Sequence, residues 1–337
     1  MRPRRLALVL GFALGCSHSE PFSTLPPDPL GPTGTTLPRR LTFNARSDIT
    51  PSVAGDTLVY SRVDADRADG DRCLALLPIE GGTLVAARCA RGNLADSVRD
   101  SWLYPAISPD RQRVAFARER LQYRAGSLLE RTLVVAPIGA PDSAVVVVDG
   151  YALPDGGFAS GYRDVTWRDD TTLRFLGGIE SAGGGAVGGF SGRGVFEVAL
   201  VGDPAGVPVL VPGTAGAIDY GIGEDGAVYI LPGGSAAVFR LVDGSAPEEI
   251  ARFTGVAETP LVGLTGMAVS DGVVAVIGDL FYPEVGTVPQ LLVIDVANGG
   301  PQTAIPLLFT PQRLAGVPGG GRIVVESNGD LWLVAVR

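Results

Sequence analysis

The sequence predicts an all-β fold, a six-bladed β-propeller with four-stranded blades whose ring is closed by an N-terminal strand. Three observations support this class. A strand–turn–strand unit, clearest in residues 103–118, occurs six times at spacings of roughly 47 to 60 residues, which suit a four-stranded blade. A second pair of strand-like runs follows each of the first five units. The sixth repeat stops one strand short of a complete blade, at Arg337.

Each copy of the unit contains a short apolar strand, a turn with Asp or Gly, and a strand rich in Val, Ile, Leu and aromatic residues, which is the pattern of a β-hairpin. The copies occupy residues 49–60, 104–116, 164–175, 218–230, 266–276 and 314–325. The strand pairs that follow them occupy residues 74–79 and 84–88, 132–137 and 144–148, 195–201 and 207–211, 237–242 and 249–253, and 291–296 and 303–309.

The last repeat supplies residues 330–336 as its third strand and has no fourth. An open edge within the ring would leave backbone groups unpaired. Residues 38–43 have the pattern of a strand but precede the first unit, so they belong to no blade of their own. We therefore expect residues 38–43 to pair with the last strand and to close the ring.

Two insertions interrupt the compact repeat. Residues 118–131 separate two strands of the second unit and include, at 121–131, the only segment in which we expect a turn or two of helix. The glycine-rich residues 177–194 separate the equivalent strands of the third unit and lack the ending of a phosphate-binding loop, so we expect a flexible insertion. Both should emerge on the same face, where adjacent long loops make a plausible docking surface.

Four aspartates occupy equivalent turns between the first two strands of their units, namely Asp110, Asp169, Asp225 and Asp271. Asp side chains in turns accept hydrogen bonds from the backbone two residues further on. We therefore assign these four residues a turn-capping role rather than a role in metal binding.

The three cysteines indicate an exported protein. Cys73 and Cys89 lie symmetrically about Gly81, so a hairpin centred on that glycine would place them opposite each other and allow a disulfide. The alternative is two free thiols. Cys16 ends the segment Ala13-Leu-Gly-Cys16, which has the pattern of a lipoprotein cleavage box.

The N-terminal residues predict a membrane-tethered protein. Residues 1–15 combine a basic start with a short apolar run and are expected to be a signal peptide that is cut before Cys16, whose thiol would take the lipid. The alternatives are a plain signal peptide with an incidental cysteine, or a short membrane anchor. Residues 16–37 are rich in Pro, Ser, Thr and Gly, which predicts a flexible tether. We expect the propeller, residues 38–337, to be held by its lipid at the outer membrane, facing the periplasm.

A resemblance to a known family rests on Leu41-Thr-Phe-Asn44, Ile49-Thr-Pro-Ser52 and residues 104–116. These segments resemble the six-bladed propeller of the TolB family, the periplasmic component of the Tol–Pal system, and the resemblance extends over residues 38–337. They also define a broader repeat superfamily that includes the propellers of prolyl-oligopeptidase-like enzymes. Because TolB uses its propeller to dock partners, the resemblance implies that this chain binds protein.

Composition argues against several kinds of chemistry. The only histidine, His18, lies in the tether, where it cannot be held against a nucleophile or a zinc ion. The formal net charge of −9 opposes nucleic-acid binding. We therefore predict a monomer that is not an enzyme, uses no cofactor, and contacts the membrane through its lipid alone.

The candidate binding residues lie at or near the loops that enter the inner strands, where we expect them to surround the mouth of the central channel. A mouth with mixed charge and aromatic side chains suits a peptide or a loop of an envelope protein. The alternative is that these residues only solvate the channel mouth and bind no ligand. The alternative function is a calcium-dependent hydrolase or lactonase-like enzyme, or a ligand sensor, although the chain has only four Asn residues to supply ligands. The candidates are Asp48, Asp100, Trp102, Arg163, Asp164, Tyr220 and Arg313.

Overall fold

A computed structural model describes most of the expected propeller. The described residues are 38–42, 47–63, 72–80, 86–88, 98–122, 128–149, 151–152, 158–159, 162–180, 193–201, 206–242 and 246–337. Within these ranges the regular structure consists of strands β1 to β26 and one short 3₁₀ helix, η2 (Pro141–Ser143). This part of the chain contains no helix with the length and apolarity needed to cross a membrane.

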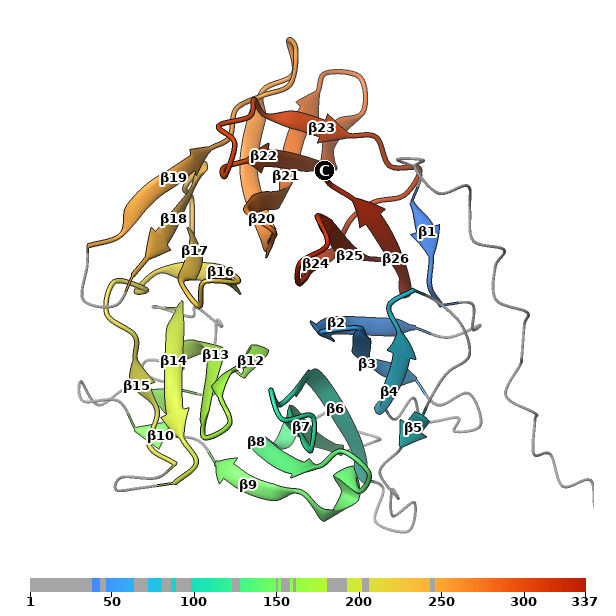
Figure 1. Ribbon diagram of the computed structural model, residues 1–337, viewed down its shortest axis with the longest axis vertical. Helices are drawn as coiled ribbons and strands as arrows, with labels where there is room; N and C mark the ends of the chain where they lie inside the picture. Colours follow the sequence, from blue (N-terminus) through green and yellow to red (C-terminus); the bar gives the residue numbers. More distant parts are fainter. Residues whose placement is uncertain are drawn as a thin grey trace, which may run out of the picture.

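The strands form antiparallel sheets arranged around a central axis, as in a β-propeller with four-stranded blades (Figure 1). The inner strands are β2 (Asp48–Ala54), β6 (Val98–Ile107), β12 (Arg163–Asp169), β16 (Ala217–Ile222), β20 (Leu261–Ser270) and β24 (Arg313–Val317). Their hairpin partners are β3 (Thr57–Val63), β7 (Arg113–Gln122), β13 (Thr172–Glu180), β17 (Val228–Pro232), β21 (Val273–Tyr282) and β25 (Arg322–Ser327). All six copies of the repeated unit therefore form the predicted hairpins.

The third strands are β4 (Arg72–Pro78), β8 (Leu128–Pro137), β14 (Arg193–Ala199), β18 (Ala237–Leu241), β22 (Gly286–Asp295) and β26 (Asp330–Ala335). The outer strands are β5 (Ala86–Arg88), β9 (Val145–Val148), β15 (Val209–Leu210), β19 (Glu248–Arg252) and β23 (Thr303–Ile305). A single parallel pair, Arg72 with Ser101, joins β4 to β6, so that β2 to β9 count as one eight-stranded sheet.

The N-terminal strand β1 (Arg39–Arg40) pairs with β26, as the missing fourth strand predicts. The ladder is shorter than expected, but two further hydrogen bonds extend it. The backbone N–H of Leu41 donates to the carbonyl of Leu331 over 2.7 Å, and the N–H of Leu331 donates to Thr42 Oγ1 over 3.0 Å. Leu41 is 6% exposed and packs among residues of both ends of the chain. The N-terminal segment thus covers the edge of the last strand.

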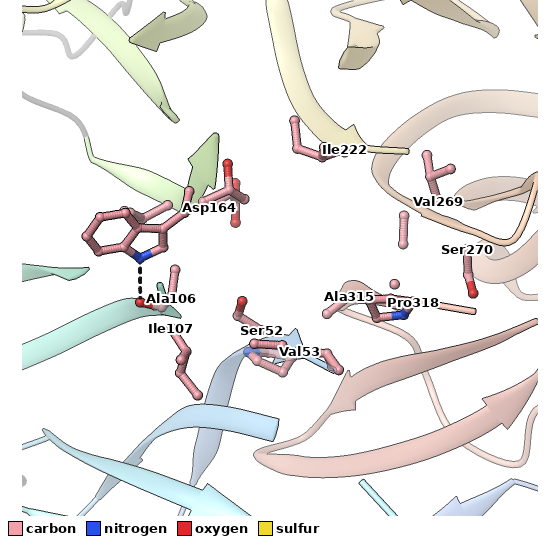
Figure 2. Close-up of a pocket in the computed structure, with 18 of the residues that line it drawn as sticks. Ser52, Val53, Ala106, Ile107, Asp164, Ile222, Val269, Ser270, Ala315 and Pro318 are labelled. Atoms are coloured by element: carbon pink, nitrogen blue, oxygen red, sulfur yellow. Dashed lines mark hydrogen bonds between the residues drawn. The ribbon is translucent and has the colours of Figure 1, made fainter. Parts of the chain in front are cut away.

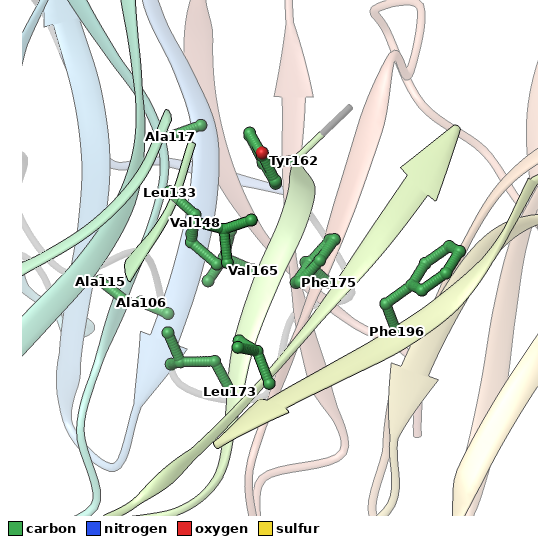
Figure 3. Packing of buried hydrophobic residues seen from close by; sticks show 11 residues of the cluster. Ala106, Ala115, Ala117, Leu133, Val148, Tyr162, Val165, Leu173, Phe175 and Phe196 are labelled. Atoms are coloured by element: carbon green, nitrogen blue, oxygen red, sulfur yellow. The ribbon is translucent and has the colours of Figure 1, made fainter. Parts of the chain in front are cut away.

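The hydrophobic core lies between neighbouring sheets. Figure 3 shows the cluster between the β6–β9 and β12–β14 strands. At its centre Phe175 stacks on Phe196 with ring centroids 5.8 Å apart, and Tyr162 meets Phe175 edge-on at 5.3 Å. All three rings are almost completely buried. Burial of these large side chains is the main force that holds adjacent sheets together.

The predicted helix at 121–131 is wrong, because strands occupy the described part of that segment. β7 runs to Gln122 and β8 begins at Leu128, so the two strands extend into the insertion. Cross-strand pairing replaces the helix: Arg131 Nε donates to Glu119 Oε1 over 2.8 Å. A helical pattern of residues in the sequence does not indicate cross-strand pairs of this kind.

The other insertion also begins and ends as strand. Gly177 pairs with Gly194, and Gly178 pairs with Arg193, so the glycines at both ends of the segment belong to the β13–β14 ladder. The interior of this insertion, 181–192, lies outside the described residues. An unexpected hairpin, β10 (Tyr151–Ala152) and β11 (Phe158–Ala159), adds to the far end of β13.

The turn-capping role of the aspartates is confirmed at three positions. Asp110, Asp169 and Asp225 each accept a hydrogen bond from the backbone N–H two residues on, at 3.0, 2.8 and 3.0 Å. Asp271 differs, because it has a positive φ and its carboxylate pairs with Arg337 Nη1 at 2.7 Å.

The β4–β5 hairpin has the register that the proposed disulfide needs. Leu74 pairs with Arg88 and Leu76 with Ala86, which centres the hairpin on position 81. Cys73 is buried and is not a free thiol. Cys89 lies outside the described residues, as does Cys16, so the pairing with Cys89 stays a prediction.

We expect Cys73→Ser and Cys89→Ser to destabilise the protein by similar amounts, and the double variant to cost no more than either single one. The chain-entropy model gives about 3 kcal/mol for a loop of this length before strain is subtracted. Peptide mapping without reduction should recover both cysteines in one cross-linked fragment. Alkylation of both thiols in unreduced protein would contradict the pairing.

Candidate functional site: a central cavity with a charged end

The inner strands enclose a central cavity of about 450 Å³. Most of its wall consists of small apolar and small polar side chains from β2, β6, β12, β16, β20 and β24, and the charged side chains of Arg111 and Glu224 also line it. Figure 2 shows Ser52 with its hydroxyl toward the open space and Ile222 on the opposite side. Trp167 also lines the cavity, and its indole Nε1 donates to the carbonyl of Ala106 over 2.9 Å.

A recurring backbone feature lies beside this cavity, at Asp164, which lines it, and at Thr50 and Tyr104, which line an adjacent pocket of about 30 Å³. Thr50, Tyr104 and Asp164 hold the same place in three successive repeats, and each has a positive φ of 50° to 52° beside a break in strand register. Positive φ is uncommon for residues other than glycine, and a β-bulge redirects the side chain that it carries. The fold therefore positions these three side chains by local strain that the neighbouring sheets sustain.

Hydrogen bonds between strands of neighbouring repeats hold these bulges in place. The N–H of Tyr104 donates to Thr50 Oγ1 over 3.1 Å, and the N–H of Thr50 donates to Glu326 Oε2 over 2.8 Å. Further round the ring, the N–H of Met267 donates to Asp219 Oδ2 over 2.7 Å. Polar side chains thus satisfy backbone donors that the bulges remove from the ladders.

The guanidinium of Arg313, which lines the small pocket, lies among acidic side chains. Arg313 Nη2 donates to the hydroxyl of Tyr104 over 3.1 Å, and its Cζ lies 5.0 Å from the centre of the Tyr104 ring. Arg313 also approaches Asp164 Oδ1 at 3.5 Å and Glu326 Oε2 at 3.9 Å. Because β24 and β12 lie on opposite sides of the central opening (Figure 1), the Arg313 side chain reaches across the axis.

The carboxyl groups here are in an unfavourable environment for charge. Burial, followed by the negative charge of Asp164, raises the pKa of Asp219 to about 8 against the opposing effect of hydrogen bonds from the Met267 and Tyr220 backbones. Burial also raises the pKa of Asp164 and of Glu326, and Arg313 opposes both changes. A buried acid with a pKa near neutrality is a frequent property of functional sites.

The raised pKa of Asp219 predicts a pH dependence of stability. Between its ordinary value of 3.8 and about 8, the folded protein keeps a proton that the unfolded chain releases. This contribution to stability is therefore full below the lower value and is lost as the pH rises through the window. We expect Asp219→Asn to remove that loss, so that its melting temperature relative to the original protein rises from pH 5 to pH 9. Parallel melting curves across this range would contradict the assignment.

The structure brings together only part of the predicted mouth. Arg313 and Asp164 meet, and Tyr220 lies beside them, donating its hydroxyl to the Asp164 carbonyl over 2.6 Å. Arg163 is partly buried on β12 next to Asp164. Asp100 pairs with Arg120 at 3.2 Å.

Three of the predicted mouth residues are interior residues, which corrects their expected exposure. Asp48 and Trp102 are 0% and 3% exposed, and Tyr220 is 5% exposed. Trp102 packs against Phe116 with ring centroids 5.1 Å apart. For Trp102 the physical reason is that β6 starts earlier than predicted, at Val98, so Trp102 lies within the strand and not at its entry.

Tyr104, Asp219 and Glu326 were missed by the sequence reasoning. Tyr104 and Asp219 correspond in their repeats to Thr50 and Asp164, within one residue of the start of each copy, so an alignment of the copies would have found them. Glu326 carries no such signal, because it enters the site from β25.

Within the described ranges, no three or more His, Cys, Asp or Glu side chains are grouped as metal ligands would be. Asp219 and Glu326 instead accept backbone hydrogen bonds, and Asp164 faces Arg313. These carboxyl groups are thus arranged as acceptors around a guanidinium and backbone amides. The site is therefore built for hydrogen bonding and charge pairing.

The fold and the central cavity define the chain as a β-propeller protein. No family model matches it, and no curated protein matches it in sequence. Among solved structures it is similar to a gluconolactonase from Xanthomonas campestris, at 13% identity and a TM-score of 0.52, covering 89% of this chain and 94% of that one.

Two other solved structures show a similar fold. The PQQ-bound aldose sugar dehydrogenase from Streptomyces coelicolor has 14% identity and a TM-score of 0.50, covering 88% of this chain and 96% of that one. The Cps50 (Swd1) β-propeller domain from Myceliophteria thermophila has 10% identity and a TM-score of 0.50, covering 88% and 99%. The chain spans 50% of a puromycin hydrolase and 45% of a prolyl endopeptidase that it also matches. At these identities the likeness shows the fold alone.

Proposed function

We propose that the protein is a non-catalytic binding module whose central cavity holds a peptide or a loop of a partner protein of the cell envelope. The observation that carries the proposal is the cavity itself, which has mostly small side chains along its wall and is also lined by Asp219 and by Asp164, the partner of Arg313. Pockets that combine apolar walls with a few convergent polar groups are typical ligand sites. The resemblance to the TolB propeller supports a protein or peptide as the ligand.

The alternative is a hydrolase-like propeller enzyme. The similarity to a gluconolactonase is compatible with it, but the charged cluster favours binding. The carboxyl groups of this cluster face Arg313 or accept backbone hydrogen bonds, and the single histidine of the sequence, His18, lies outside the described residues. Turnover of a lactone or phosphoester by the purified protein, abolished by chelation of calcium, would favour the enzyme.

Peptide selection on the full chain tests the binding function. A peptide selected from a display library should bind the original protein and should lose at least about tenfold in affinity to Ser52→Phe, because the new ring fills the cavity. The matched control is Ala246→Phe, which adds the same ring at an exposed site on the perimeter. Equal affinity for both variants would place the binding site elsewhere and contradict the proposal.

The ring is inferred to have six blades. The repeated hairpins support this count if the eight-stranded sheet is divided at its single parallel pair, which separates β2–β5 from β6–β9. Under this division the fourth strand of the last blade is β1, which pairs with β26.

The lipid anchor, the outer-membrane location and the monomeric state are part of the same proposal and rest on the sequence. Cys16→Ser should move the protein from the membrane to the soluble fraction and abolish incorporation of labelled fatty acid, without changing peptide affinity. Retention of Cys16→Ser in the membrane would contradict lipidation as the anchor.

A further inference from the structure

We propose that the partner protein enters the central cavity through the face formed by the hairpin turns, and that it inserts the tip of a loop with an apolar side chain. This inference rests on the proposed binding function and specifies the direction of entry and the chemistry of the ligand. It places the docking surface on the face opposite to the one at which the inner strands begin.

The exposure of the cavity wall indicates where the cavity opens. The exposed residues that line it all lie in turns that join inner strands to their hairpin partners, namely Gly55, Pro109, Arg111, Glu224 and Pro318. Every other residue of the wall is buried or half-buried. The mouth of the cavity therefore lies between the hairpin turns.

Arg313 obstructs the opposite end of the cavity. Its Nη2 donates to the Tyr104 hydroxyl over 3.1 Å, and its Nη1 lies 3.5 Å from Asp164 Oδ1 on the other side of the axis. Arg313, Tyr104 and Thr50 line the small pocket and not the central cavity, and each precedes the cavity residues of its own strand. A ligand that came from the side where the inner strands begin would therefore meet this cluster before it reached the cavity.

Small side chains create the space inside the cavity. The third residue of each repeated unit, counted from residues 50, 104, 164, 219, 266 and 314, is small and lines the cavity in every unit. These residues are Ser52, Ala106, Thr166, Gly221, Ala268 and Gly316. The residues that follow them in the first five units are apolar and also line the cavity, namely Val53, Ile107, Trp167, Ile222 and Val269. A ligand that passes the turns thus meets an apolar wall around a space that can accept a side chain.

The acidic side chains that line the inner part of the cavity do not favour a charged ligand. Burial raises the pKa of Asp219 to about 8, so this carboxyl is mostly protonated at neutral pH. Asp164 already has a guanidinium, that of Arg313, as its partner. A charged ligand group would lose its water here without gaining an opposite charge of its own.

The charged side chains at the mouth are also engaged within the protein. Arg111 Nη1 pairs with Asp56 Oδ1 at 3.0 Å, and Glu224 accepts a hydrogen bond from the N–H of Gly319. A chain terminus would bring a full charge into the cavity, whereas the tip of a loop brings none. The wall therefore favours a loop with an apolar side chain over either end of a chain.

Labelling of an introduced thiol in the full chain tests both the entrance and the chemistry. Ser52→Cys places a thiol on the cavity wall, where Figure 2 shows the Ser52 hydroxyl toward the open space. The neutral apolar probe is benzyl methanethiosulfonate, and the charged probes are its trimethylammonium-ethyl and sulfonato-ethyl analogues. Each rate is measured relative to that of Ala246→Cys, an exposed site on the perimeter, after subtraction of the labelling of the unsubstituted chain.

We expect Glu224→Trp, which adds a large ring at the mouth, to slow benzyl labelling of Ser52→Cys by at least about tenfold. The matched control is Thr265→Trp, which should leave the rate unchanged. Thr265 is exposed, precedes the cavity residues of β20 and does not itself line the cavity. Thermal melting identifies a variant that fails to fold, and Pro109→Trp at the same mouth then replaces Glu224→Trp.

The choice of probe tests the apolar ligand. Relative to the control site, the benzyl probe should label Ser52→Cys at least about fivefold faster than either charged probe, because the wall does not compensate the desolvation of a charge.

The levels of the proposal fail differently. A labelling rate with Glu224→Trp equal to or above the rate with Thr265→Trp would overturn entry through the turns and leave an accessible binding cavity. Labelling by a charged probe as fast as by the benzyl probe would overturn the apolar loop tip. Absence of labelling by all three probes in folded Ser52→Cys would show that the cavity is closed to ligands, which would overturn the proposed binding function as well.

Discussion

Deletion of residues 17–43 is expected to lower the melting temperature of the protein by about 10 °C or more, whereas deletion of 17–36 should leave it nearly unchanged. The longer deletion removes β1 and the buried side chain of Leu41. Loss of a buried leucine side chain alone costs about 2–5 kcal/mol. It also removes the pair of Arg40 with Asp330 at 2.6 Å and leaves the edge of β26 unpaired.

Differential scanning calorimetry of the two deletions measures the contrast directly. The shorter deletion is the matched control, because it ends before the first residue of β1. Restoring residues 38–43 alone should restore the melting temperature. Equal melting of both deletions would show that the ring does not depend on the N-terminal strand.

Gly316→Ala is expected to destabilise the protein by about 3 kcal/mol, near the upper end of the usual range for an overpacked interior. A Cβ at position 316 would lie 1.9 Å from the carbonyl oxygen of Val269, which is a backbone atom of the neighbouring inner strand. Neither β20 nor β24 can relieve this overlap by a rotamer change. The two strands must move apart, which disturbs the cavity wall that both of them form.

Gly263→Ala on β20 is the matched control, because nothing lies within 4 Å of the Cβ that it adds. Its stability should be equal to or slightly above that of the original protein, since alanine restricts the unfolded chain more than glycine does. Urea unfolding of both variants checks the difference. Similar stability of the two variants would mean that β20 and β24 do not approach each other as closely as described.

The sequence was most informative where structure is local. The hairpins follow from short apolar runs separated by Asp and Gly turns, and three of the four aspartates cap those turns as predicted. The pairing of β1 with β26 could be predicted because the sixth repeat has no fourth strand of its own, so its third strand needed a partner from elsewhere in the chain. Residues 121–122 and 128–131 could not be assigned in this way, because their conformation depends on pairing with each other across a long hairpin.

The charged site was only half predictable. Arg313 and Asp164 follow from their places at strand entries, but their meeting depends on the strand arrangement around the ring. The directions of Tyr104 and Asp164 depend on bulges with positive φ, which the neighbouring repeats stabilise. The exposure of Trp102 was predicted wrongly because the start of β6 is set by its pairing with β7 and not by a local signal in the sequence.

The proposed function requires that the protein hold its ligand inside the propeller. A crystal structure of the full chain with a selected peptide tests it most directly. We predict electron density for the peptide within the cavity, beside Ser52. Density confined to the outer strands or to the rim, with the cavity unchanged, would contradict the account.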